Sequence, residues 1–260
     1  MKNMHSFFRK LGKRAYGIAQ RGGGARVVGK NRFGDATIKA DIEIERMVSK
    51  ELSRVDCSFI GEETAGWWRD DAEFLFVLDP LDGSENYRNG FPSYSFAICG
   101  GRLKKGTFSD IEEALVLDLA NGDEYYARKG GGVFVNGRKI RRKKPGRRLI
   151  CADLGNLKAG AEVFSFLSKR GYMRMLGAST LEMCLAACGR LEAFLHLGNS
   201  MRAVHAAGCF MMKEAGMNLA NRSGGELCFG VGENGFDVIA TWDAGLQEEI
   251  IEFLSSTNLG

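Results

Sequence analysis

The sequence of 260 residues is poor in the residues on which several common enzyme classes depend. It contains only three histidines and three prolines, and it has no G-x-S-x-G segment that would place a serine nucleophile on a sharp turn. His5, His196 and His205 stand far apart without a supporting pattern around them. A serine or cysteine hydrolase is therefore disfavoured.

Long apolar runs and paired cysteines are also absent. No uncharged stretch approaches the roughly 20 apolar residues that a membrane-spanning helix needs, and the first residues lack the apolar block of a secretory signal, although an Arg-rich transit peptide is an alternative. The seven cysteines are scattered, which argues against a disulfide framework and fits a reducing cytoplasm. With 36 basic and 32 acidic residues and 45% hydrophobic residues, the composition is that of an ordinary globular protein.

Hydrophobic periodicity predicts a chain of mixed helices and strands. Apolar residues recur at helical spacing in residues 1–21 and again in 41–53. Unbroken apolar runs at 59–60 and 74–78 predict strands buried on both faces. A meander follows over 93–140, with Asn-Gly pairs at 121–122 and 136–137 as hairpin signals. Further strands are predicted near 148–153, 172–176, 191–197, 226–229 and 237–241, and helices near 158–169, 178–188, 204–215 and 243–254.

The change from a meander to alternating helices and strands predicts two sub-domains. The basic segment 138–148 interrupts the pattern, and we expect the boundary near residue 145, which gives sub-domains 1–145 and 146–260. This segment has two interpretations: a surface that attracts polyanions, or a solvated hairpin end and junction. It lacks regularly interleaved aromatic residues, so we expect no specific nucleic-acid partner.

The most informative feature is a pair of acidic clusters that follow buried strands. The first is Gly61-Glu62-Glu63-Thr64, and the second is Asp79-Pro80-Leu81-Asp82-Gly83-Ser84. Oxygen ligands of this kind suit hard divalent cations, which offset the repulsion between the acids. Gly83 permits a tight turn after which free backbone amides can hold a phosphate. The clusters therefore predict a metal and phosphate site; the alternative is a capped turn with solvated acids.

These clusters resemble the inositol monophosphatase family of metal-dependent sugar phosphatases. The resemblance extends over most of the chain, and four further segments carry it: Asp35-Ala36-Thr37 through Asp41 to Glu45, Glu124 to Gly137, Gly177 to Phe194, and Lys213-Glu214-Ala215-Gly216. It implies an α+β fold of mixed helices and sheets, arranged as a layered αβαβα sandwich, and a homodimer that acts on small phosphorylated substrates.

The resemblance also implies roles for individual residues. Glu62, Asp79 and the Leu81 carbonyl would hold a first metal ion, and Asp79 and Asp82 would share a second. Glu62 and Ser84, with Asp41 behind Ser84, would orient and deprotonate the attacking water. The amides of Gly83 and Ser84 would hold the phosphate oxygens. The implied metal is Mg2+.

One departure from the family pattern concerns the second metal ion. The family supplies another aspartate from the start of a late helix, but residues 193–213 contain no carboxylate. Two alignments place either His205 or Val204 at that position. An imidazole ligand favours Mn2+ or Zn2+ over Mg2+, so we expect weak binding of the second metal. Alternatively, His205 has a purely structural role.

Substrate recognition rests on less specific positions. The resemblance places Ser179, Glu214 and Arg174 beside the sugar, although Glu214 and Arg174 are otherwise ordinary surface residues. Inositol phosphates and fructose 1,6-bisphosphate are both expected substrates. Two hypotheses remain: a metal-dependent phosphomonoesterase, or a degenerate member that binds phosphate ligands or partner proteins without catalysis.

Two other patterns are weaker. Residues 230–235 satisfy G-x-G-x-x-G, but they lead into a strand and lack the βαβ unit of a dinucleotide site. Cys184 and Cys188 are one helical turn apart and could bind zinc with His196. Their apolar neighbours favour a packed helix face instead.

Overall fold

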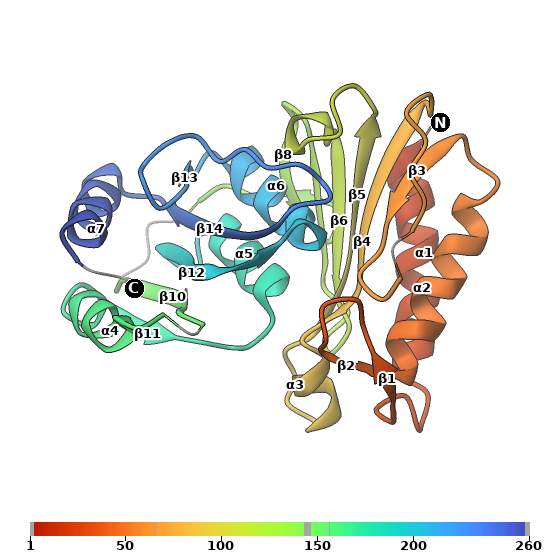
Figure 1. Ribbon diagram of the computed structural model, residues 1–260, viewed down its shortest axis with the longest axis horizontal. Coiled ribbons are helices and arrows are strands. Elements are labelled where there is room, and N and C mark those ends of the chain that lie inside the picture. Colours follow the sequence, from red (N-terminus) through yellow and green to blue (C-terminus); the bar gives the residue numbers. More distant parts are fainter. Residues whose placement is uncertain (1–2, 65, 143–146, 156, 258–260) are drawn as a thin grey trace.

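The computed structural model describes residues 3–64, 66–142, 147–155 and 157–257, and its helices and sheets stack in five layers (Figure 1). In order across the molecule, the layers are α1 (Met4–Ala19) with α2 (Lys39–Leu52), a seven-stranded sheet, α5 (Ser179–Ala187) with α6 (Ala206–Ala215), a five-stranded sheet, and α4 (Gly160–Ser168) with α7 (Ala244–Ser256). The predicted α+β class and αβαβα sandwich are confirmed.

The seven-stranded sheet contains the predicted meander and joins it to the two buried strands. Its order is β3-β4-β5-β6-β7-β8-β9, in which β3 and β4 are parallel and the other neighbours are antiparallel. Its strands are β3 (Cys57–Ile60), β4 (Phe74–Asp82), β5 (Ser95–Arg102), β6 (Glu113–Asp118), β7 (Glu124–Arg128), β8 (Gly132–Val135) and β9 (Arg138–Lys139), and the 3-10 turn η1 (Phe108–Asp110) precedes β6.

The two Asn-Gly pairs, both predicted as hairpin turns, lie in turns of different length. Asn136 and Gly137 form a two-residue turn between β8 and β9, both with positive φ, as a type I′ hairpin requires. The pair at 121–122 instead lies within the longer connection 119–123 between β6 and β7. There the Asp118 carboxylate accepts hydrogen bonds from the amides of Ala120 and Asn121, which shapes a wider turn.

The five-stranded sheet has the order β11-β10-β12-β14-β13. Its strands are β10 (Leu149–Asp153), β11 (Tyr172–Arg174), β12 (Ala193–Arg202), β13 (Asn218–Ala220) and β14 (Asn234–Thr241). The predicted strand at 226–229 is wrong, and β13 occupies the edge instead. Phe229 is nevertheless buried, because its ring stacks on Phe108 and Phe236 and its carbonyl accepts a hydrogen bond from the Phe108 amide.

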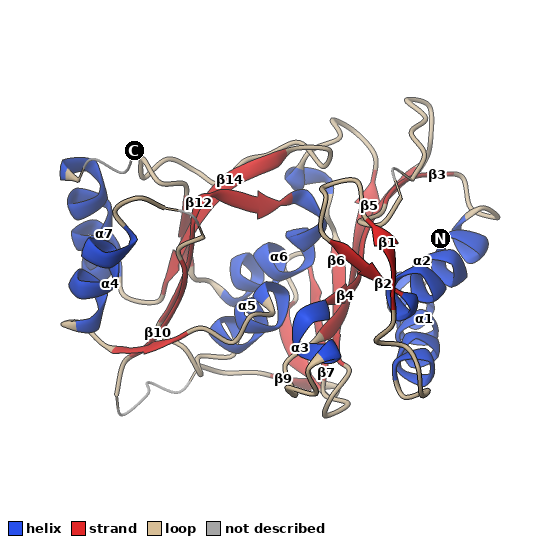
Figure 2. Ribbon diagram, turned by 60° about the horizontal axis from the view of Figure 1, so that its bottom comes forward, coloured by secondary structure: helices blue, strands red, loops and turns tan. Residues whose placement is uncertain are grey.

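Three apolar cores separate the layers, and the sequence of β4 shows how they form. Phe74, Phe76 and Leu78 pack in the core under α1 and α2, whereas Leu75 and Val77 pack in the central core with α5 and α6. A strand covered on both faces needs no polar alternation, which explains its unbroken apolar run. Figure 2 shows α5 and α6 enclosed between the two sheets.

Several segments lie beside this framework. The hairpin of β1 (Val27–Lys30) and β2 (Ala36–Ile38) was not predicted from the sequence, and the short helix α3 (Ser84–Arg88) follows the predicted turn at Gly83. The expected sub-domain boundary near residue 145 falls outside the described residues, as do Lys143 and Lys144 of the basic segment. Within the described part, no helix has the length and apolar character needed to cross a membrane.

Candidate active site

The acidic clusters meet because β3 and β4 are parallel neighbours. Residues after the end of β3 and residues in the last part of β4 therefore lie at the same edge of the sheet. The turn after β3 is fixed by Glu45 of α2, a buried carboxylate that accepts hydrogen bonds from the amides of Glu63 and Thr64, each at 2.8 Å. A Cβ atom at Gly61 would lie only 2.6 Å from the Glu45 carboxylate, so a larger residue there would displace the side chain that fixes this turn.

A cavity of about 320 Å3 opens at this edge, and most of the predicted site residues line it. Its walls come from the β1–β2 hairpin, the turn after β3, the end of β4, the loop before α5 and the segment before α6. The lining residues are Asn31, Asp35, Ala36, Glu62, Glu63, Asp79, Leu81, Asp82, Gly83, Ser84, Glu85, Gly177 and His205. Six of them are acidic, and none is lysine or arginine.

Asp79 is the least compensated of these acids. Its side chain is 1% exposed, and neither carboxylate oxygen has a hydrogen-bond partner among the described residues. Burial raises the pKa of Asp79 well above its usual value, and the nearby Glu62 and Asp82 carboxylates raise it further. A buried carboxylate without donors is costly, and a bound cation would remove that cost.

Asp82 and the two glutamates are also held in a setting that disfavours their charge. The Asp82 carboxylate accepts hydrogen bonds from the amides of Thr180 (2.7 Å) and Leu181 (3.3 Å) at the start of α5. Even so, burial raises the pKa of Asp82 to about 7, and burial raises the pKa values of Glu62 and Glu63 to about 7 as well. The site therefore contains more carboxylates than its hydrogen-bond donors can stabilise in the charged form.

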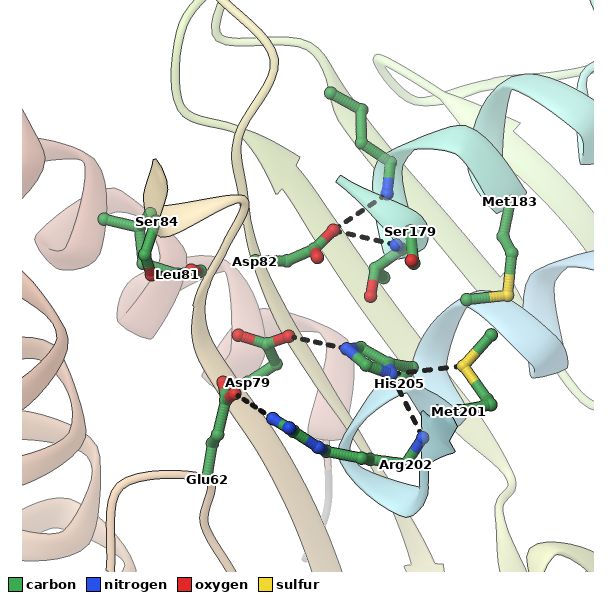
Figure 3. A network of polar contacts seen from close by, with 12 residues as sticks. Glu62, Asp79, Leu81, Asp82, Ser84, Ser179, Met183, Met201, Arg202 and His205 are labelled. Carbon is green, nitrogen blue, oxygen red and sulfur yellow. Dashed lines mark hydrogen bonds and ion pairs between the residues drawn. The ribbon is translucent and has the colours of Figure 1, made fainter. Parts of the chain in front are cut away.

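His205 completes this cluster from the opposite wall. It ends the 3-10 turn η2 (Ala203–His205) after β12, and its Nε2 atom lies 3.6 Å from the Asp79 carboxylate (Figure 3). One ligand atom each from Asp79, Asp82 and His205 lie within 4.8 Å of one another. Burial lowers the pKa of His205 to about 3, so the imidazole is neutral, and one of its two ring nitrogens carries a lone pair. Val204, its alternative in the sequence comparison, is buried and does not line the cavity.

The turn after β4 contributes Gly83 and Ser84 to the lining of the cavity. Gly83 has a φ of 85°, and a Cβ atom there would lie 2.7 Å from the Ser93 carbonyl oxygen, so only glycine fits. The Ser84 hydroxyl lies 3.2 Å from the Asp41 carboxylate and 2.9 Å from the Leu81 carbonyl oxygen. Asp41 also accepts a hydrogen bond from the Ile38 amide at the start of α2, and burial raises its pKa to about 8.

The three residues predicted beside the sugar lie outside the lining of the cavity. Ser179 is the first residue of α5, and its hydroxyl lies 3.5 Å from Nδ1 of His196. Arg174 on β11 is exposed, and its guanidinium bonds the Met173 carbonyl. Glu214 lies near the end of α6 that is opposite His205, about 13 Å away along the helix axis.

Sequence reasoning missed two contributions to the site. Asn31 and Asp35 come from the tip of the unpredicted β1–β2 hairpin. Arg202, at the end of β12, places its guanidinium 2.5 Å from the Asp35 carboxylate and 3.4 Å from Glu62 (Figure 3). A single arginine in an apolar stretch gives no sequence signal of such a role, because only the register of β12 directs it toward the acids.

The other zinc hypothesis, at Cys184 and Cys188, finds no support in the geometry. Cys184 is fully buried in the central core, and both cysteines are free thiols whose pKa values are raised by burial. Among the described residues, the cluster able to hold a metal ion is Asp79, Asp82 and His205.

Comparisons of the sequence and of the structure with known proteins identify one family. The model of the inositol monophosphatase family matches residues 4–256. A fructose-1,6-bisphosphatase/inositol-1-monophosphatase of Methanocaldococcus jannaschii is 34% identical over 206 residues, which cover 78% of each chain. A crystal structure titled inositol monophosphatase-fructose 1,6 bisphosphatase superposes with a TM-score of 0.83 at 26% identity, over 96% of this chain and 98% of that one.

A longer relative shares only part of its length with this chain. A bifunctional NADP phosphatase/NAD kinase of Methanococcus maripaludis is 28% identical over 221 residues, which are 75% of this chain and 38% of that protein. The chain thus spans about two fifths of that bifunctional relative.

Proposed function

The chain belongs to the inositol monophosphatase family, and from this premise we propose that it is a metal-dependent phosphomonoesterase acting on small sugar or inositol phosphates. One observation carries the proposal most directly. The buried Asp79 carboxylate has no hydrogen-bond partner among the described residues, and it lies in a cavity with Glu62, Asp82 and His205. Such an arrangement suits a divalent cation better than it suits any purely structural role.

The residues fit two neighbouring cation positions. Glu62, Asp79 and the Leu81 carbonyl would hold one ion, and Asp79, Asp82 and His205 would hold the other. The oxygen-rich set suits Mg2+, whereas the His205 imidazole favours Mn2+ or Zn2+ at the second position. When bound, the metal ions supply Lewis acidity that polarises the phosphate and stabilises the leaving oxygen.

The chain's own groups position the substrate and move the proton. Gly83 and Ser84 line the cavity, and their amides would orient the phosphate oxygens. Glu62 and the Ser84 hydroxyl orient the attacking water, and Asp41 stands behind Ser84 to receive a proton. Burial raises the pKa of Asp41 to about 8, so this carboxyl group is largely protonated at neutral pH, and it can receive the proton once bound cations favour its ionised form.

Inositol 1-phosphate and fructose 1,6-bisphosphate are the first substrates to consider, because similar proteins bear those activities in their names. The phosphate of NADP is a third, suggested by the bifunctional relative. Ser179, Arg174 and Glu214 remain predicted sugar contacts.

The proposal also covers the oligomeric state of the protein and its cellular compartment. We infer a homodimer, supported by family membership and by the exposed Tyr172 and Met175 on and just after the edge strand β11. A reducing cytoplasm is supported by the seven free cysteines.

The test is phosphate release from these substrates with Mg2+ and then Mn2+, using Asp82→Asn as a control. Metal-dependent turnover that is lost in Asp82→Asn supports the phosphatase. A folded protein that is inactive with both ions and all three substrates would favour the degenerate member that binds a phosphate ligand or a partner without catalysis.

A further inference from the structure

Arg202 pairs with acids from two different walls of the cavity. It extends from the end of β12, and its guanidinium lies 2.5 Å from the Asp35 carboxylate and 3.4 Å from the Glu62 carboxylate. It also stacks on Phe33 at 4.2 Å. The Arg202 side chain is 23% exposed and the Glu62 side chain 15%, so their contact is partly shielded from solvent, whereas the Asp35 side chain is 56% exposed. A guanidinium in this setting is a fixed positive charge.

The hairpin tip that meets Arg202 is itself ordered by local hydrogen bonds. The Asn31 side chain accepts hydrogen bonds from the amides of Phe33 and Asp35, both at 3.0 Å. The tip is further closed by a bond from the Asn31 amide to the Asp35 carbonyl. These hydrogen bonds fix the backbone position of Asp35 independently of Arg202. The ion pair therefore joins Arg202 to an ordered segment of the chain.

The position of Arg202 matters because Glu62 is a proposed metal ligand. One Glu62 oxygen faces Arg202 (Figure 3), so an ion at Glu62 must share that carboxylate with the guanidinium. The positive charge also repels any cation that approaches Glu62 and Asp35. Arg202 has a further link to the metal cluster, because its backbone amide donates a hydrogen bond to Nδ1 of His205 at 3.4 Å.

We propose that Arg202 is a built-in cation of this site, which neutralises Glu62 and Asp35 in place of a divalent ion and thereby weakens metal binding at Glu62. This inference rests on the proposed function, since it concerns the metal ions of that reaction. It makes Arg202 a positioning residue that sets how many ions the site holds. The acids at Asp79 and Asp82 then remain the principal metal position.

The experiment is a Mn2+ titration of the full chain after treatment with a chelator, in which free Mn2+ is followed by electron paramagnetic resonance without substrate. Arg202→Gln is expected to bind Mn2+ about tenfold more tightly, or to bind one more ion, because it removes a full charge close to the site. Arg202→Lys keeps the charge and should resemble the wild type. The combination of Arg202→Gln with Glu62→Gln should lose the gain.

Arg170 provides a matched control on the far side of the molecule. It too pairs with an acid, Glu249, and stacks on a phenylalanine, Phe166. Arg170→Gln makes the same charge change between α4 and α7 and should leave Mn2+ binding unchanged. Equal Mn2+ binding in the wild type and Arg202→Gln would overturn the role of Arg202 alone. No binding in either protein would overturn the proposed function as well.

Discussion

Two buried aspartates in the seven-stranded half of the molecule have opposite environments. Asp110, in the turn η1, accepts hydrogen bonds from the amides of Lys104, Lys105 and Gly106 at 2.8–2.9 Å. Burial acts to raise the pKa of Asp110, but these amides outweigh it and the pKa is lowered. Asp79, at the end of β4, has no such donors, and its pKa is raised.

The difference separates a structural acid from a functional one. The backbone around Asp110 is folded to satisfy its charge, so the carboxylate stabilises the turn. Among the described residues, the backbone around Asp79 offers no such donor, and its neighbours Glu62 and Asp82 are themselves acids, a setting whose cost a bound cation would relieve. Burial alone would not distinguish the two residues, since Asp110 is 3% exposed and Asp79 1%.

Exchanging each carboxylate for an amide should give opposite results. Asp79→Asn is expected to reduce turnover by at least about a hundredfold, because metal ions contribute several kcal/mol to such reactions. The same change should raise the melting temperature of the metal-free protein at pH 8, since an uncompensated buried charge is removed. Asp110→Asn should cost about 1–3 kcal/mol of unfolding free energy and leave metal dependence unchanged.

Thermal unfolding and phosphate release, measured on both variants, check this contrast. A metal-free Asp79→Asn protein that is less stable than the wild type would mean that the carboxylate has a structural partner, and the contrast would fail.

In the wild type, the pH dependence of stability should show that the acids of the cavity are poorly compensated. Asp41, Glu62, Glu63 and Asp82 have pKa values of about 7 to 8 in the folded protein, against about 4 when unfolded. The folded state therefore holds more protons, and stability falls as pH rises toward 8. Below about pH 6.5 the neutral buried His205 acts in the opposite sense, because its folded pKa is lowered.

Because four acids outweigh one histidine, the decrease should extend from about pH 5 to about 8 in a chelating buffer. Mg2+ should reduce it, since a bound cation favours the charged carboxylates. Melting temperatures measured across this range, with Asp41→Asn as a variant that lacks one titrating group, provide the check. A flat profile in the chelating buffer would argue that the acids are already compensated.

A smaller effect is expected at His205, where this chain departs from the family pattern. His205→Asp supplies a hard oxygen ligand, so half-maximal activity should need several-fold less Mg2+. Mg2+ titrations of activity in the wild type and the variant measure this shift. No change would assign His205 a structural role, with its ring held by Arg202 and Met201.

The sequence predicted the parts of the site that are continuous along the chain. Asp79, Leu81, Asp82, Gly83 and Ser84 follow one another at the end of a strand, and the apolar run before them identifies that strand. Their proximity to Glu62 follows from two parallel strands that end at one edge. The mixture of helices and strands was likewise accessible from hydrophobic periodicity, whereas the layered arrangement was implied by the resemblance to the family.

The contributions that the sequence did not reveal depend on tertiary contacts. The β1–β2 hairpin is short, its first strand is exposed, and it has no apolar alternation that would predict a strand. Arg202 reaches the acids only because β12 ends beside them. At 226–229 the apolar residues are buried by aromatic stacking without a strand, and the short edge strand β13 forms instead.

The most direct test of the account is a calorimetric titration of Mn2+ into the wild type, Asp79→Asn and Asp110→Asn at pH 7.5. We predict binding to the wild type and to Asp110→Asn with similar affinity, and little or no binding to Asp79→Asn. Equal Mn2+ binding by Asp79→Asn and the wild type would contradict the claim that the unpartnered carboxylate at the end of β4 is the centre of the metal site.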